Sequence, residues 1–271
     1  MKKLPVILLL LLISASALIV VLFLTGVFAE PALVPIKIDT TPNQSTSSDN
    51  GNIISTKISS TTEIITKQAT TTFMIPAQLD LGVPFVSQAP LRDWAMPYQE
   101  ACEEASMIAV SKYYTKGALD SQTINRELLA LMTWEGKQGY PNDLTAQQTS
   151  DILLKYFNLS SHLDSNVTVD KIKYELSKGH PIIVPAAGRL LGNPYFHQPG
   201  PIFHMLVIRG YDSSNFITDD VGTNTKGERF KYKYQKLINA IHDWSPDLAQ
   251  GGMTDAEMAQ GRKVMIVIDN L

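Results

Sequence analysis

The single cysteine of this chain, Cys102, is the residue best placed to do chemistry. It is followed by Glu103 and Glu104 and then by apolar residues at helical spacing, which predicts a helix that begins at or near the cysteine. The N-terminus of a helix lowers the pKa of a thiol, and a neighbouring imidazole lowers it further. We therefore expect Cys102 to be a nucleophile.

The imidazole is expected from a distant segment, at His204, where an apolar run begins. A second apolar run, residues 216–218, ends at Asp219 and Asp220. A turn between the two runs makes an antiparallel hairpin, which brings the end of the second strand beside the start of the first. A carboxylate placed there orients the imidazole as a general base. The alternative base is His197, whose loop is otherwise a wall of a substrate cleft or a packed loop.

Acyl transfer through a thiolate also needs hydrogen-bond donors for the oxyanion of the intermediate. Gln88, directly after a predicted strand at residues 83–87, can supply a side-chain amide beside the backbone N–H of the cysteine. Gln99 is nearer to the cysteine in sequence, but its side chain can equally serve the start of the helix.

The segments that must position these residues are helical first and extended later. Four helices are expected at residues 102–114, 120–132, 146–157 and 169–177, the second capped by Asp120 or Ser121, the third by a capping box at 145–148 and the fourth by Thr168. Strands are expected at residues 182–184, 205–209, 216–218, 229–232 and 264–268, with a short helix at 234–242. Helices followed by strands indicate an α+β fold.

These segments resemble the bacteriocin-leader (double-glycine) processing peptidases of the papain-like cysteine peptidase superfamily. The resemblance rests on a Val-Pro-Phe-Val-Ser-Gln segment, a cysteine that opens a helix ending in Tyr-Tyr, an apolar strand running from His204 to Gly-Tyr-Asp, and an acidic residue that closes the next strand. It covers about residues 79–244. It implies a papain-like fold in which the nucleophile helix packs on a C-terminal antiparallel sheet.

The resemblance also implies the role of each candidate residue. Cys102 corresponds to the nucleophile, His204 to the general base and acid, Asp220 rather than Asp219 to the orienting carboxylate, and Gln88 to the oxyanion donor. The implied activity is that of a thiol protease, a hydrolase that acts on a peptide or protein and needs no cofactor or metal.

The chain departs from the family pattern beside the nucleophile. Family members commonly have Gly-Pro after the cysteine and Asp-Pro at the acidic position, where this chain has Glu103-Glu104 and Asp220-Val221. Two carboxylates that pointed at the thiol would oppose thiolate formation. The alternative is therefore a degenerate domain that binds peptides or cell-surface polymers without turnover.

An uncharged, Leu-rich run at residues 4–29 follows two lysines and is long enough to cross a bilayer core of roughly 30 Å. We expect a single-pass anchor with the rest of the chain outside the cell membrane, or a secreted protein if the run is a cleaved signal. Residues 30–77 are rich in Ser and Thr and are expected to be a flexible stalk. Residues 78–271 are then the globular, peptidase-like domain.

Composition excludes several other classes of protein. The formal net charge is -3 and the pI about 6.0, which argues against nucleic-acid binding. One cysteine cannot form an intramolecular disulfide or a thiolate-rich zinc site. The sequence contains no HExxH, GxSxG or glycine-rich phosphate loop, which are the common metalloprotease, serine-hydrolase and nucleotide motifs.

Overall fold

The computed structural model describes residues 74–249 and 252–269. The predicted anchor or signal at residues 1–29 and most of the predicted stalk lie outside the described residues. Within the two described ranges, no helix is both long and apolar enough to cross a membrane.

The described residues form an α+β fold around a seven-stranded antiparallel sheet, as the sequence predicts. The strand order is β2-β7-β3-β4-β5-β6, and β1 pairs separately with β4. The strands are β1 (Leu79–Asp80), β2 (Ser161–Asp164), β3 (Ile182–Ala187), β4 (Phe203–Tyr211), β5 (Asn215–Asp219), β6 (Phe230–Lys233) and β7 (Met265–Ile268). The nine-residue β4 is the central strand and is buried along its whole length.

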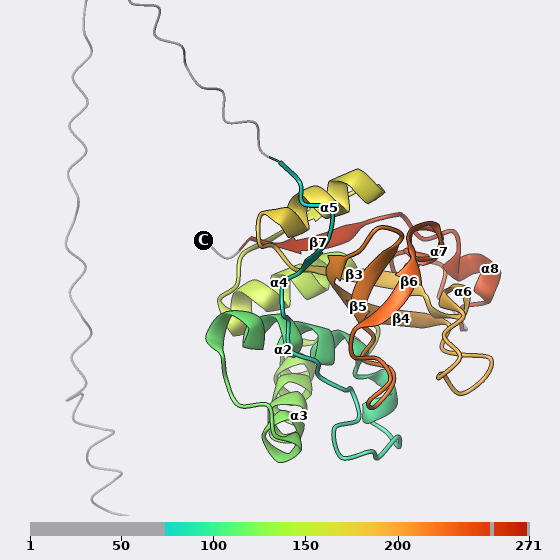
Figure 1. Ribbon diagram of the computed structural model, residues 1–271. Helices are drawn as coiled ribbons and strands as arrows, with labels where there is room; N and C mark the ends of the chain where they lie inside the picture. The colour runs from blue at the N-terminus through green and yellow to red at the C-terminus, as the bar shows by residue number, and fades with distance from the viewer. Residues whose placement is uncertain (1–73, 250–251, 270–271) are drawn as a thin grey trace, which may run out of the picture. The chain divides into compact units, whose positions relative to one another are not determined.

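Both faces of the sheet are apolar and both are covered by helices (Figure 1). Along β4 the side chains alternate, so Met205 and Val207 join one core cluster while Leu206 and Ile208 join the other. The first cluster includes side chains of α2 (Cys102–Thr115), α3 (Ser121–Gln138) and α4 (Ala146–Phe157). The second includes side chains of α5 (Val169–Ser177) and α7 (Tyr234–Ala240). The remaining helical segments are a 3₁₀ helix (Tyr98–Glu100), α6 (Gly188–Leu191) and α8 (Asp255–Met258).

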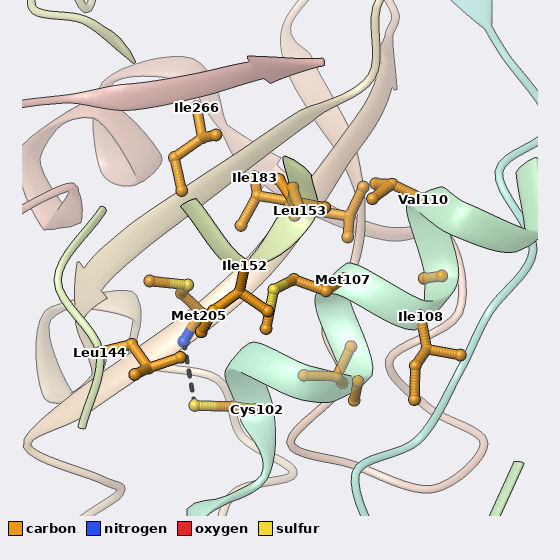
Figure 2. Packing of buried hydrophobic residues seen from close by; sticks show 14 of the residues in the cluster. Cys102, Met107, Ile108, Val110, Leu144, Ile152, Leu153, Ile183, Met205 and Ile266 are labelled. Atoms are coloured by element: carbon orange, nitrogen blue, oxygen red, sulfur yellow. Dashed lines mark hydrogen bonds between the residues drawn. The ribbon is translucent and has the colours of Figure 1, made fainter. Parts of the chain in front are cut away.

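Helix α2 is buried on all sides over its first three turns. Every residue from Cys102 to Lys112 is buried, and Met107 and Val110 pack with residues of α4 and the sheet (Figure 2). A helix that is enclosed in this way has no solvent face for its polar side chains. Glu103 and Glu104 are therefore buried in the protein.

The predicted helix boundaries are mostly confirmed. The side chain of Asp120 caps α3, the capping box of Thr145 and Gln148 opens α4, and Thr168 caps α5. Helix α3 is longer than the predicted 120–132, since it runs to Gln138 and ends where Gly139 adopts a left-handed conformation, with φ of 80°.

The strand predicted at residues 83–87 is wrong. The chain bonds to β4 at β1 and through the N–H of Leu81, which donates to the Arg209 carbonyl at 3.0 Å, and the next residue, Gly82, has a positive φ of 71°. Pro84 has no N–H to donate to a ladder. The chain returns to the sheet end at Gln88, whose N–H donates to the carbonyl of Val221 at 3.1 Å. Strand β2 was not predicted, because three of its four residues are polar.

A β-bulge at Arg209 creates a buried ion-pair network. The register between β4 and β5 shifts between Ile208 and Gly210. Arg209 Nε lies 2.8 Å from Asp80 Oδ1, and Arg209 Nη1 lies 3.1 Å from Asp219 Oδ1. Burial raises the pKa of Asp219 to about 6, against the lowering effect of the Arg209 charge. Arg209 thus ties β1 to the sheet and neutralises a fully buried carboxylate.

We expect Arg209→Met to lower the free energy of unfolding by about 3–5 kcal/mol, because it leaves the buried Asp219 carboxylate without its cation. Urea denaturation followed by circular dichroism measures this loss. Arg229→Met is the matched control, since Arg229 also pairs with Asp80 but its side chain is 57% exposed. That variant should change stability by less than about 1 kcal/mol, and equal losses in the two variants would contradict the network.

Candidate active site

A cleft of about 1030 Å³ lies where the start of α2 meets the start of β4. Cys102 and His204 both line it, together with Gln88. The walls come from loops before α2, before β4 and after β5, and many of their side chains are aromatic. The aromatic lining residues are Trp94, Tyr195, Phe196, Phe203 and Trp244.

Cys102 is the first residue of α2, which confirms the predicted helix start. Its sulfur accepts a hydrogen bond from the backbone N–H of Met205 at 3.3 Å (Figure 2). Met205 directly follows His204 on β4, so the sulfur lies beside the strand that carries the histidine. The sulfur also lies 2.9 Å from Glu103 Oε2. The cysteine is 6% exposed, at the edge between cleft and core.

The resting sulfur is a thiol. Burial raises the pKa of Cys102 well above its ordinary value, and an ionised Glu103 raises it further through its charge and hydrogen bond. The Met205 N–H has the opposite effect, because it donates to the sulfur. The sequence interpretation expected the helix N-terminus to lower the pKa of this thiol. In the structure its position at the helix N-terminus is not enough to make Cys102 a thiolate.

His204 and Asp220 form the pair that the hairpin argument predicts. Val207 pairs with Asp219 in the antiparallel β4–β5 ladder, which places Asp220 near the start of β4. His204 Nε2 lies 2.9 Å from Asp220 Oδ1, and both side chains are buried. A carboxylate can only accept, so Nε2 carries the proton and Nδ1 is the basic nitrogen of the neutral ring.

Four groups donate to the Asp220 carboxylate. His204 Nε2 and the Gly222 N–H, at 3.3 Å, contact Oδ1, whereas Asn193 Nδ2, at 2.8 Å, and the Tyr232 hydroxyl, at 2.6 Å, contact Oδ2. Burial alone would raise the pKa of Asp220, but the His204 charge and these hydrogen bonds hold it below its usual range. The carboxylate is therefore ionised although it is fully buried.

Asp219 does not contact His204 and instead pairs with Arg209, on the other side of the strand end. Asn193 and Tyr232 were missed by the sequence interpretation. Asn193 lies in the loop after α6 and Tyr232 lies on β6, and neither belongs to a local motif that would indicate contact with Asp220.

Gln88 lies at the cleft, but the two N–H groups of its amide are already used. Its Nε2 donates to the carbonyls of Tyr98, at 2.9 Å, and Gln99, at 3.2 Å. Its Oε1 is buried and has no hydrogen-bond partner in the described part of the chain. Gln88 thus holds the turn before α2 in this structure. Gln99 is exposed at the cleft.

Two neighbours hold the His204 ring in place. Phe196 packs edge-on, with its ring centroid 5.3 Å from that of His204. A Cβ added to Gly222 would lie 2.8 Å from His204 Cε1, so only glycine fits there without a shift of the ring. His197 also lines the cleft, where it is exposed.

The described residues do not include a group of three or more His, Cys, Asp or Glu side chains that could hold a metal ion.

Comparison with known proteins places this cleft within a described family. The model of the peptidase C39-like family matches residues 80–247, a range that contains Cys102, His204 and Asp220. A crystal structure of a protein from Bacillus anthracis, described as a C39-like peptidase, is similar at 12% sequence identity, with a TM-score of 0.45. The match covers 72% of this chain and 98% of that one. No curated protein matches the chain.

Proposed function

From the premise that this chain belongs to the peptidase C39-like family, we propose that it is a cysteine hydrolase that cleaves peptide bonds through Cys102, His204 and Asp220. One observation supports this most. His204 is bonded to a buried, ionised Asp220 at 2.9 Å, and the next residue, Met205, donates to the Cys102 sulfur at 3.3 Å. The proposed nucleophile and base thus line one cleft, and the proposed orienting carboxylate is buried beside the base.

In the proposed reaction His204 Nδ1 takes the proton of the Cys102 thiol, and the sulfur attacks the carbonyl carbon of the scissile amide. The protonated His204 then gives its Nδ1 proton to the leaving amine, which leaves a thioester on Cys102. His204 next takes a proton from water, and the hydroxide that forms hydrolyses the thioester. Asp220 stabilises the imidazolium at each stage and keeps Nε2 protonated.

The oxyanion is proposed to be held by the backbone N–H of Cys102 and by the Gln88 amide. The N–H groups of the first helical turn have no acceptor within the helix, so that of Cys102 is available. Gln88 has to exchange one of its bonds to Tyr98 or Gln99 for a bond to the substrate. Substrate binding would therefore be coupled to a small movement of the turn before α2.

The aromatic and proline side chains around the cleft fit a peptide or protein substrate. We also propose that residues 1–29 hold the domain at the outer face of the membrane, or direct its secretion if they are removed. A flexible stalk at residues 30–77 would then let the cleft reach substrates near the membrane surface.

A second candidate function is peptide binding without turnover. It is favoured by the state of Cys102, which is almost fully buried, is bonded to Glu103 and has a raised thiol pKa. Such a domain would use the same cleft and the same aromatic walls, but it would release its ligand unchanged.

Incubation of the full chain with a peptide library separates the two functions. We expect new termini, detected by mass spectrometry, to appear within hours. Because Cys102 is the only cysteine, iodoacetamide can modify no other thiol, and the alkylated protein is the matched control. Cleavage that survives complete alkylation would rule out Cys102 as the nucleophile, and binding without any products would favour the second function.

A further inference from the structure

The carboxyl group of Glu103 links the Cys102 sulfur to the loop before α4. Its Oε2 lies 2.9 Å from the sulfur, and its Oε1 accepts from the backbone N–H of Leu144 at 3.0 Å. The residue is 1% exposed. Glu103 thus has one fixed geometry, and that geometry places an ionisable oxygen on the atom proposed to be the nucleophile.

The surroundings of Glu103 favour its neutral form. Within the described residues no Lys, Arg or His forms an ion pair with it. The charged groups that act on it are acidic, namely Asp143 beside the cleft and Glu104 on the same helix, which itself interacts with Glu135 of α3. Burial raises the pKa of Glu103 to about 8, although the Cys102 and Leu144 hydrogen bonds lower it.

The direction of the Cys102–Glu103 hydrogen bond depends on which group carries the proton. A neutral Glu103 can donate its O–H to a sulfur lone pair, which leaves the thiol proton free to point at His204. An ionised Glu103 can only accept, so it holds the thiol proton away from His204. The same contact therefore either assists or blocks the proton transfer.

We propose that Glu103 is a further catalytic residue, whose protonated carboxyl donates to the Cys102 sulfur and, with the Met205 N–H, supports the thiolate. This inference rests on the proposed function. The proton balance is simple: the thiol proton moves to His204 Nδ1, and Glu103 keeps its own proton throughout. Two donors then face the sulfur anion, in place of the cationic neighbours that many reactive cysteines use.

The inference predicts an unusual pH dependence of sulfur reactivity. An ordinary thiol reacts faster as pH rises, until it is fully ionised. Here ionisation of Glu103 places a negative charge 2.9 Å from the sulfur, which raises the pKa of the thiol just as the pH approaches it. The rate of alkylation should therefore rise with pH up to the pKa of Glu103 and level off above it, because the state with a neutral Glu103 and a thiolate has the same number of protons as the state with an ionised Glu103 and a thiol.

The predicted pH dependence can be tested by measuring how fast iodoacetamide alkylates Cys102. The rate is followed by intact-mass spectrometry on the full chain between pH 6 and about 9.5. Glu103→Gln keeps the shape of the side chain, can donate an N–H to the sulfur and does not titrate, so the rate should continue to rise above the pH at which the wild type levels off. Glu104→Gln is the matched control and should level off as the wild type does, because its carboxyl does not contact the sulfur. Circular dichroism at each pH confirms that the chain stays folded.

A wild-type rate that rises steadily with pH, or a Glu103→Gln profile that matches the wild type, would overturn the inference. Its failure is separable from that of the proposed function. If the protein cleaves peptides but Glu103→Gln does not change the pH profile of alkylation, only the role of Glu103 is rejected. The expected alkylation profile without any peptide products rejects turnover, while the effect of Glu103 on the sulfur stands.

Discussion

Replacement of His204 by alanine is expected to lower peptide hydrolysis by about 10³-fold or more. Without Nδ1 the thiol loses the base that the proposed reaction assigns to it, and burial keeps Cys102 protonated. The loss should appear in kcat, with KM changed much less, because the imidazole acts on the sulfur rather than on the bound peptide. Steady-state cleavage of a peptide from the library screen measures both constants.

His197→Ala is the matched control for this variant. His197 lines the same cleft, but it is exposed and lies outside the Cys102–His204–Asp220 arrangement. It should affect kcat by only a few fold. If His197→Ala abolished cleavage while His204→Ala did not, the assignment of the base would have to be exchanged.

Asp220→Asn is expected to lower kcat by about 10² to 10⁴, although it changes only one atom. All four groups that face this carboxylate are donors, so only a group with acceptors on both sides satisfies them. In an asparagine one side becomes an NH₂. If the NH₂ faces His204 it imposes the wrong tautomer, and if it faces Tyr232 and Asn193 it leaves donors unpaired in a buried site.

Asp219→Asn separates this effect from a general loss of stability. Asp219 is the adjacent residue, is equally buried, and pairs with Arg209 rather than with His204. We expect lower stability in urea but a nearly unchanged kcat for the folded protein. NMR of the imidazole nitrogens provides a second readout, since only Asp220→Asn should change the His204 tautomer. Equal losses of kcat in both variants would contradict a specific role for Asp220.

The network around Asp220 suggests how the cleft keeps its charge distribution. The negative charge of Asp220 is neutralised by four donors, whereas the carboxyls of Glu103 and Glu104 remain neutral because burial raises their pKa. The site thus contains three buried acidic side chains near the sulfur and the imidazole, but only one of them needs to be ionised at neutral pH. A nucleophilic Cys102, as proposed, is thus compatible with the Glu103-Glu104 pair that follows it.

Much of the fold could be predicted from local sequence signals. Capping residues such as Asp120, Thr145 and Thr168 marked helix starts correctly, because capping depends on atoms only two or three residues apart. The antiparallel β4–β5 hairpin was also predictable, since a short turn between two apolar runs leaves few other arrangements. That hairpin is why His204 and the end of β5 could be placed together before the structure was considered.

Predictions that needed distant contacts did less well. The Val83 to Ser87 segment has the composition of a strand, but it forms none, and it follows a glycine with a positive φ, Gly82. Gln88 was expected to be a free amide donor, yet the carbonyls of Tyr98 and Gln99 occupy it. In both cases the hydrogen-bond partners of the segment depend on how the chain folds in three dimensions, which the local sequence does not show.

The sequence alone determined the helix that begins at Cys102 and the pairing of His204 with the end of β5. Both follow from patterns that act over a few residues or one hairpin. Only the tertiary structure decided that Asn193 and Tyr232 complete the shell of Asp220 and that Glu103 turns inward to the sulfur. The physical reason is burial. Whether a carboxyl is ionised depends on the solvent it loses and the donors it gains, and both are set by segments far apart in the chain.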